Sequence, residues 1–221
     1  MRAGCLWSAG KDSCLACYKA KAEGHQIIRL FNFINAQGSL GHGLAPELIR
    51  DQAGLTGIAL VQKNMPAPGE DYEGAFKGLI LDYKIKENLE AIVFGDIYLI
   101  EHRDWIVKVC KQIGILPIFP LWGIDTQKII DDFVGLGFQA MITCVKPQLL
   151  TDKWLARHID KNFIRDLSDY NPQIDVCGEK GEFHTLVTGG PLFSGRIAPV
   201  ETAIKNEGNY RILEIKKYKV V

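Results

Sequence analysis

Five short apolar segments alternate with helical patterns up to Phe119, and this alternation limits the chain to very few folds. The apolar segments cover residues 3–7, 26–34, 57–62, 91–94 and 115–119. The helical patterns between them cover residues 11–23, 46–53, 72–86 and 102–113. Such alternation is typical of parallel strands joined by crossover helices. We therefore predict an α/β fold with a doubly wound, parallel, five-stranded sheet, whose ligand crevice lies outside the carboxyl ends of the strands.

Beyond Trp122 the pattern changes. The sequence there predicts helices over 126–136 and 152–169, a strand over 138–145, glycine-rich turns, and terminal strands near 200–205 and 210–219. We expect a smaller C-terminal α+β domain, with the boundary within 122–125. The predicted domains are 1–123 and 124–221.

Composition excludes several classes of protein. The chain is 47% hydrophobic and 24% charged, as in soluble globular proteins. Its 26 Lys and Arg residues balance 26 Asp and Glu residues, which argues against a general nucleic-acid binder. The longest uncharged stretch near the middle, 114–124, is too short for a membrane span, and the apolar run 3–7 is too short for a secretory signal. We expect a cytoplasmic protein with no membrane partner.

The cysteines and most histidines favour structural roles. Cys5, Cys110 and Cys144 lie in apolar runs, as buried thiols do. Cys14 and Cys17 form a C-x-x-C pair without a second pair at zinc spacing, so packing of the first helix is favoured over a metal or redox site. Three further side chains are interpreted as surface or helix-end residues: His25, His102 and His158.

The hexapeptide Ser8-Ala9-Gly10-Lys11-Asp12-Ser13, called the phosphate loop below, lies where the first strand turns into the first helix. Small residues let the backbone approach a ligand, and the amides of a helix start attract anions. Lys11 and the hydroxyls of Ser8 and Ser13 add further groups that can bind an anion. Lys11 is followed by Asp12, so the loop is not a Walker A sequence. An ordinary helix cap would explain Ser8 but not the whole hexapeptide.

The phosphate loop resembles the pyrophosphate-binding loop of the N-type ATP pyrophosphatases, Ser-Gly-Gly-x-Asp-Ser. The resemblance implies an adenine nucleotide alpha hydrolase-like fold of the HUP type, with ATP bound by the whole loop. Ala9 departs from the usual glycine, and an alanine fits if its φ angle is not positive.

A second sequence, Val176-Cys177-Gly178-Glu179-Lys180-Gly181-Glu182-Phe183-His184-Thr185, is called the C-terminal motif below. Together with Gly190-Pro191-Leu192-Phe193, it resembles the C-terminal signature of the diphthine–ammonia ligase family. Further resemblance covers His42-Gly43, Phe94-Gly95-Asp96 with Arg103, and the stretches 109–122 and 139–142. The match spans residues 1 to about 200.

That resemblance implies an ATP-dependent amide ligase. Family members adenylate a carboxylate, release pyrophosphate, and amidate the carboxylate with ammonia. The implied catalytic residues are Lys11, Asp12, Asp96 and Arg103, with Gly95 added to the ATP-binding set and Mg²⁺ near Asp12 or Asp96. The implied substrate-binding residues are His42, Gly43, Gly178, Glu179, Gly181, Glu182, His184 and Thr185.

The sequence leaves several roles open. Arg103 either reaches back to the crevice or pairs at the surface with Glu101 or Asp104. Glu179 and Glu182 form either one acidic surface for a cation or a solvated turn. The acceptor is elongation factor two if the source organism makes diphthamide, but the form of the motif at His184 is more similar to bacterial relatives. The sequence also allows a different acceptor, either RNA or a small molecule, and a role as a nucleotide-binding regulator. The oligomeric state is open, and a homodimer is one of the states allowed.

Overall fold

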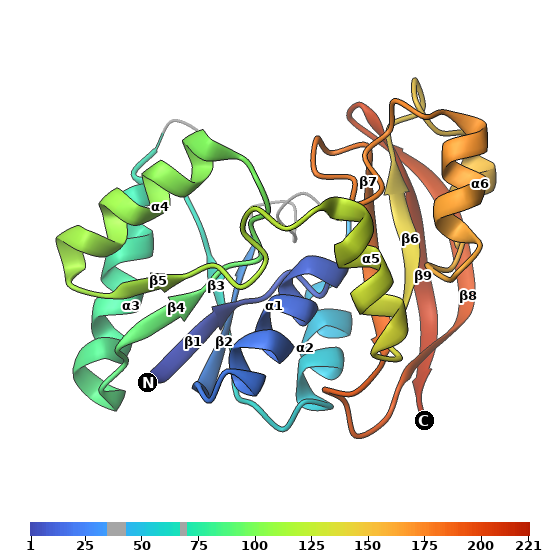
Figure 1. The fold of residues 1–221 in the computed structure, drawn as a ribbon. Helices are drawn as coiled ribbons and strands as arrows, with labels where there is room; N and C mark the ends of the chain where they lie inside the picture. Colours follow the sequence, from blue (N-terminus) through green and yellow to red (C-terminus); the bar gives the residue numbers. More distant parts are fainter. Residues whose placement is uncertain (35–42, 67–69) are drawn as a thin grey trace. The chain divides into compact units, whose positions relative to one another are not determined.

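The computed structural model describes residues 1–34, 43–66 and 70–221, and the chain forms two compact units (Figure 1). The first unit contains Met1–Ser8, Asp12–Leu40 and Ile58–Gly123. The second contains Ala9–Lys11, Gly41–Gly57 and Ile124–Val221. The middle of the phosphate loop is therefore grouped with the second unit. His42 and most of the glycine-rich loop before residue 44 lie outside the described residues.

The first unit contains the predicted parallel sheet. Its elements are β1 (Arg2–Leu6), α1 (Lys11–Ala22), β2 (Gln26–Ile34), β3 (Leu60–Asn64), α3 (Tyr72–Glu87), β4 (Ala91–Val93), α4 (Ile100–Ile113) and β5 (Leu116–Ile118). All neighbouring strands pair in parallel, in the order β3-β2-β1-β4-β5. The prediction of a doubly wound sheet is confirmed. The order reverses at β1, between β2 and β4, and such a reversal is where sheets of this kind bind ligands.

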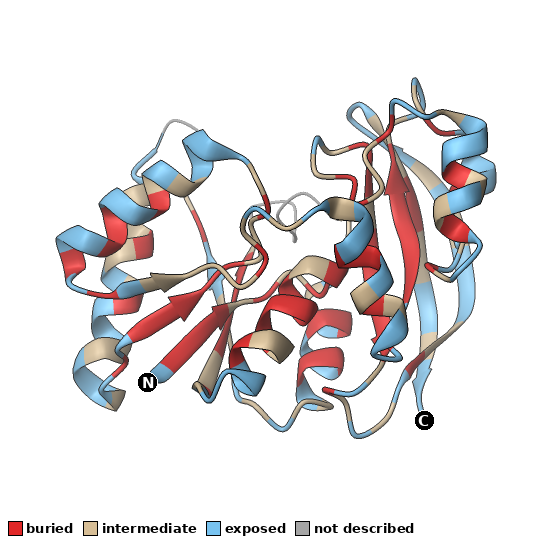
Figure 2. Cartoon of the chain, in the orientation of Figure 1, coloured by how far each residue is buried: buried red, intermediate tan, exposed pale blue. Residues whose placement is uncertain are grey.

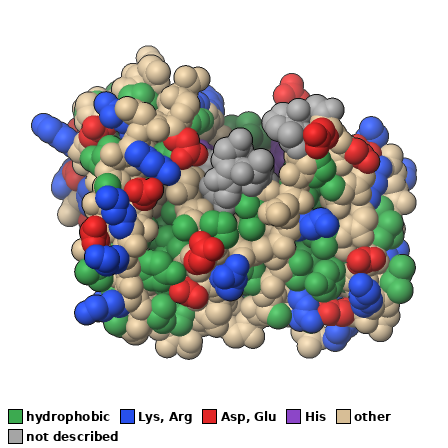
Figure 3. Space-filling model, turned by 180° about the vertical axis from the view of Figure 1, so that it is seen from behind, with side chains coloured by type: hydrophobic (Ala, Val, Ile, Leu, Met, Phe, Trp, Pro, Cys, Tyr) green, Lys and Arg blue, Asp and Glu red, His purple; other side chains and the backbone are tan. Residues whose placement is uncertain are grey.

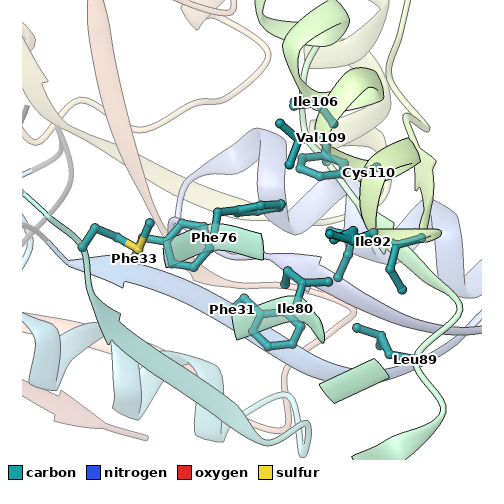
Figure 4. Packing of buried hydrophobic residues seen from close by; sticks show 13 residues of the cluster. Phe31, Phe33, Phe76, Ile80, Leu89, Ile92, Ile106, Val109 and Cys110 are labelled. Atoms are coloured by element: carbon teal, nitrogen blue, oxygen red, sulfur yellow. The ribbon is translucent and has the colours of Figure 1, made fainter. Parts of the chain in front are cut away.

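One face of this sheet carries a hydrophobic core against α3 and α4 (Figure 4). Phe31 from β2 and Ile92 from β4 lie over Phe76 and Ile80 of α3, and Val109 of α4 closes the cluster. Gly4 of β1 makes room for it, because a Cβ there would lie 2.4 Å from the ring of Phe31. The aliphatic and aromatic runs seen in the sequence thus form one continuous core.

The opposite face of β1 packs against α1 through three cysteines. Cys5, Cys14 and Cys17 are all buried and not disulfide-bonded. Burial raises the pKa of the Cys5 and Cys14 thiols well above the usual value, and the neighbouring Cys17 adds to this. The Cys5 and Cys14 thiols therefore stay protonated, which agrees with a packing role.

The second unit is built on an antiparallel sheet. Its elements are α2 (Pro46–Gly54), α5 (Thr126–Gly135), β6 (Gln139–Val145), a 3-10 turn (Asp152–Trp154), α6 (Phe163–Tyr170), β7 (Phe183–Gly189), β8 (Ile197–Glu207) and β9 (Tyr210–Val220). The strand order is β7-β6-β9-β8. Figure 2 shows β6 and β7 largely buried and much of β8 exposed. The predicted α+β character is confirmed.

Two sequence predictions in this unit are wrong. The stretch 152–169 is not one helix, because its backbone leaves helical geometry at Ala156, whose φ is +64°. The helix begins again after Asp160, whose side chain accepts hydrogen bonds from the amides of Asn162 and Phe163. The second wrong prediction is glycine-rich turns in place of strand β7. Gly178 and Gly181 are turn residues, and their presence outweighed the short apolar run that follows them.

The surface mixes charges of both signs. On the face drawn in Figure 3, basic and acidic side chains are interspersed among hydrophobic ones. Within the described residues, no helix is both long enough and apolar enough to cross a membrane.

Replacing Phe76 by alanine should lower the free energy of unfolding by about 3–5 kcal/mol, because the cavity cannot be refilled by its neighbours. Its ring lies 5.7 Å from that of Phe33 and 5.9 Å from that of Trp105. The matched control is Ile85→Ala on the same helix, where the side chain is 78% exposed and a change of roughly 0.5 kcal/mol or less is expected. Urea denaturation measures both, and equal effects would contradict the core assignment.

Candidate active site

Polar side chains fix the backbone where β1 ends. Nδ2 of Asn32, on β2, donates to the carbonyl oxygen of Trp7 (2.8 Å), and Gln62 of β3 donates to Oδ1 of Asn32 (3.2 Å). One residue further on, the amide of Ser8 donates to Oγ of Ser13 (3.3 Å), and the two hydroxyls lie 3.1 Å apart. The first unit thus holds both hydroxyls of the phosphate loop together at the start of α1.

Ala9 adopts a left-handed backbone conformation, with φ at +67°. The sequence analysis expected an alanine to fit here only if its φ angle was not positive, and this expectation is wrong. Its carbonyl oxygen accepts hydrogen bonds from the amide of Val187 (2.9 Å) and from Nε2 of Gln52 (3.0 Å). A left-handed alanine costs roughly 1–2 kcal/mol, which these bonds to buried groups offset.

Lys11, the first residue of α1, is buried to 3% exposure and contacts three residues of the C-terminal motif. Its amide donates to Oγ1 of Thr185 (3.1 Å), and its ammonium donates to the carbonyl oxygen of Cys177. The ammonium also lies 5.5 Å from the centroid of the Phe183 ring. The structure therefore brings together one residue predicted for ATP and one predicted for the substrate, Lys11 and Thr185.

In the first unit, the carboxyl end of β4 lies against the start of α1. A Cβ on Gly95 would lie 3.0 Å from the carbonyl carbon of Asp12 and 3.1 Å from the amide nitrogen of Ser13. Only a glycine allows this approach without displacing the backbone. The close approach places Asp96 and Asp12 on adjacent stretches of chain, as expected for loops that follow neighbouring parallel strands.

His102 forms a hydrogen bond with Asp96, a contact that the sequence analysis did not predict. Its Nδ1 forms a hydrogen bond with Oδ1 of Asp96, and its ring stacks parallel to that of Trp105 at 6.2 Å. The His102 side chain is 56% exposed, so the predicted surface position is right but incomplete. The available signal was its place in the first turn of the helix that follows Asp96.

Arg103 lies over aromatic rings. Its guanidinium carbon is 4.7 Å from the centroid of Trp122 and 6.0 Å from that of Phe119. Within the described residues, no ion pair joins Arg103 to Glu101 or Asp104, so the surface-pair alternative is not seen. An arginine stacked on aromatic faces keeps a planar set of donors that suits a phosphate or carboxylate.

The C-terminal motif forms a tight turn before β7. Gly178 and Gly181 have φ angles of +68° and +75°, and a Cβ on Gly178 would lie 2.8 Å from the carbonyl oxygen of Phe183. Glu182 is buried to 3% exposure, whereas Glu179 is half-buried. Because Glu182 is buried, it belongs neither to an acidic surface nor to a solvated turn. Both interpretations from the sequence are therefore wrong for this residue.

The buried carboxylate of Glu182 is incompletely paired. Its Oε1 lies 3.4 Å from the amide of Asp175, and Oε2 has no hydrogen-bond partner among the residues that the structure describes. A buried, partly unpaired carboxylate is costly unless a ligand completes it. Nearby on β7, the ring of His184 is half-buried and lies 5.9 Å from that of Tyr210. Gly43, the remaining described residue of the predicted set, packs on Ile212.

A divalent metal would have two carboxylates in the first unit. Within the described part of the chain, no group of three or more His, Cys, Asp or Glu side chains could enclose a metal ion. Mg²⁺ does not need such a cage, because it binds through one or two carboxylates together with substrate phosphates and water. Asp12 and Asp96, on adjacent stretches of chain, fit this requirement.

Comparison with known proteins gives matches along nearly the whole chain. Residues 1–117 match the family model described as the diphthamide synthase N-terminal domain, and residues 125–221 match the diphthamide synthase C-terminal domain. Diphthine–ammonia ligases from Homo sapiens and Bos taurus are 29% and 28% identical, each covering 89% of this chain and 82% of the relative. That of Schizosaccharomyces pombe is 26% identical, covering 96% of this chain and 38% of the relative.

Among solved structures, a predicted subunit of tRNA methyltransferase from Methanocaldococcus jannaschii is similar to this chain. The match has a TM-score of 0.46 and 16% identity, and covers 86% of this chain and 98% of the other.

Gly95→Ala should lower the free energy of unfolding by about 1–3 kcal/mol, because the added methyl group meets backbone atoms that cannot move aside cheaply. The matched control is Gly78→Ala in α3, where a Cβ meets nothing within 4 Å and a gain of about 0.5–1 kcal/mol is expected. Denaturant titration of both variants checks this. Two equally stabilised variants would contradict the close approach at Gly95.

Proposed function

The chain belongs to the diphthamide synthase family and is an ATP-dependent carbon–nitrogen ligase of that family; we propose that it adenylates a carboxylate and then joins ammonia to it. The observation that carries this proposal is the phosphate loop at the carboxyl end of β1, next to β4. The loop supplies amides at a helix start, two hydroxyls and a lysine, the kinds of group that support binding of pyrophosphate.

In the first step, a carboxylate oxygen of the acceptor attacks the α-phosphorus of ATP. A bond from that oxygen to phosphorus forms, and the bond to the bridging oxygen of pyrophosphate breaks. Negative charge then develops on the leaving pyrophosphate. In the second step, ammonia attacks the acyl carbon, AMP leaves with the bonding electrons, and the nitrogen loses a proton. The amide is the product.

The first step needs positive charge at the leaving group. The amides at the start of α1 and the ammonium of Lys11 supply it, provided that Lys11 exchanges the Cys177 carbonyl for a phosphate oxygen. Arg103 would add a planar set of donors from its aromatic platform. Mg²⁺, when bound by Asp12 and Asp96, would neutralise phosphate charge; His102 holds the Asp96 carboxylate in place.

The C-terminal motif would bind the acceptor and ammonia. A buried carboxylate with an unpaired oxygen favours a cationic or ammonium group, and Glu182 is that carboxylate. Glu179, His184 and Thr185 would line the same region, and Gly178 and Gly181 allow its turn. Diphthine on elongation factor two is the acceptor to test first, because the family relatives are named for it.

Product analysis separates this proposal from its rivals. Incubation with ATP, Mg²⁺, ammonium and diphthine-bearing elongation factor two should give AMP and pyrophosphate in equal amounts. Adenosine diphosphate as product would contradict adenylation. ATP that is bound but stays intact under every acceptor tested would favour the nucleotide-binding regulator instead.

Lys11→Met should weaken binding of a non-hydrolysable ATP analogue by about tenfold or more, because a charge-assisted contact contributes roughly 1.5–3 kcal/mol. Pyrophosphate release should fall at least as far. Isothermal calorimetry measures the first quantity, and a coupled assay measures the second. The matched control is Lys21→Met, an exposed position in the last turn of the same helix. Unchanged affinity in Lys11→Met would remove the lysine from the nucleotide site.

Glu182→Gln should leave the affinity for the ATP analogue within a few-fold, since a group that does not touch phosphate changes it by less than about 1.4 kcal/mol. Acceptor-dependent AMP formation should fall by roughly ten- to a hundredfold, because a cationic partner loses a charge-assisted bond. Glu201→Gln on the exposed part of β8 is the control. A large loss of nucleotide affinity would instead assign Glu182 to the ATP or metal site.

A further inference from the structure

Gln52 is a fully buried polar side chain that no motif singles out. It lies on α2, is 0% exposed, and contacts two separate segments of the second unit. Its Nε2 donates to the carbonyl oxygen of Ala9 (3.0 Å) and to that of Val187 (2.7 Å). An amide is buried at a cost unless its hydrogen bonds are made. Here one amide nitrogen links the phosphate loop to strand β7.

The two bonded carbonyls are not equivalent. Val187 lies within strand β7 and is paired with Ala140 of β6, beside a register shift in the ladder. Ala9 has a φ of +67°, a conformation that an alanine rarely adopts and that a glycine adopts freely. The bond from Gln52 and the bond from the amide of Val187 both act on the Ala9 carbonyl oxygen. These two hydrogen bonds, called the clamp, therefore constrain mainly the phosphate loop.

The direction of this carbonyl fixes the next amide. The peptide bond between Ala9 and Gly10 is trans and planar, so the N–H of Gly10 points opposite to the Ala9 carbonyl oxygen. Because that oxygen is held toward Gln52 and Val187, the Gly10 amide is held away from them. Gly10 is buried in the middle of the phosphate loop, so the hydrogen bonds to the Ala9 carbonyl oxygen set the backbone direction at the centre of this loop.

We propose that Gln52 is a positioning residue for the phosphate loop: it holds Ala9 in the left-handed conformation and so sets the course of the loop backbone through Gly10 on which ATP binding depends. This inference rests on the proposed function, since it takes the phosphate loop to be the nucleotide site. Gln52 itself touches neither ATP nor the acceptor. Its effect on binding passes through the backbone of Ala9.

The test is a double-mutant cycle on binding of a non-hydrolysable ATP analogue, measured by isothermal calorimetry on the full chain. Gln52→Met keeps the length and removes the donor, and should weaken binding about tenfold. In the background of Ala9→Gly, the same substitution should weaken binding less than about threefold, because glycine reaches a positive φ without a clamp. A role in packing alone predicts equal losses in both backgrounds.

The control is Thr188→Val, which removes a hydrogen bond from Thr188 to the carbonyl oxygen of Gln139, next to Val187 and away from the loop. It should leave analogue binding unchanged. If Gln52→Met does not fold, Gln52→Glu replaces the donor by an oxygen that repels both carbonyls, and the same cycle applies. Equal losses in both backgrounds, or no loss in either, would overturn the inference. A wild-type chain that binds no analogue would instead contradict the proposed function.

Discussion

The hydrogen bond from the amide of Val187 to the carbonyl oxygen of Ala9 joins the phosphate loop to strand β7. Two residues later the amide of Lys11 donates to Thr185, on the same strand. Ala9 and Lys11 are thus both hydrogen-bonded to β7. The geometry of the loop depends on a strand more than 170 positions away in sequence. Through these two hydrogen bonds, a displacement of β7 is expected to displace the loop backbone at Ala9 and Lys11.

A buried lysine makes this arrangement costly and useful. Removing an ammonium from water is unfavourable unless other groups replace the water. For Lys11, the carbonyl oxygen of Cys177 and the face of the Phe183 ring contribute to this. In the proposed function, a phosphate oxygen takes the place of the carbonyl and gives the ammonium a charge-assisted hydrogen bond.

Local patterns are enough to predict the first unit. The strand over Gln26–Ile34 has the predicted bounds, because its apolar run is flanked by polar residues at both ends. Contacts between distant residues are not predictable in this way. The left-handed φ of Ala9 depends on Gln52 and Val187, and no property of the hexapeptide indicates it. Strand β7 is also not predicted from the sequence. The glycines just before it, Gly178 and Gly181, form a turn and make the whole segment look like a turn.

The two halves of the proposed reaction depend on different parts of the chain, one mainly on the backbone and the other mainly on side chains. In the proposed function, the phosphate half rests on backbone geometry, set by the left-handed φ of Ala9 and by the close approach at Gly95. The acceptor half rests on particular side chains, Glu182 and His184 among them. The use of ATP follows from membership of the family, whereas the choice of acceptor belongs to the proposal, in which the residues around the Glu182 carboxylate decide it.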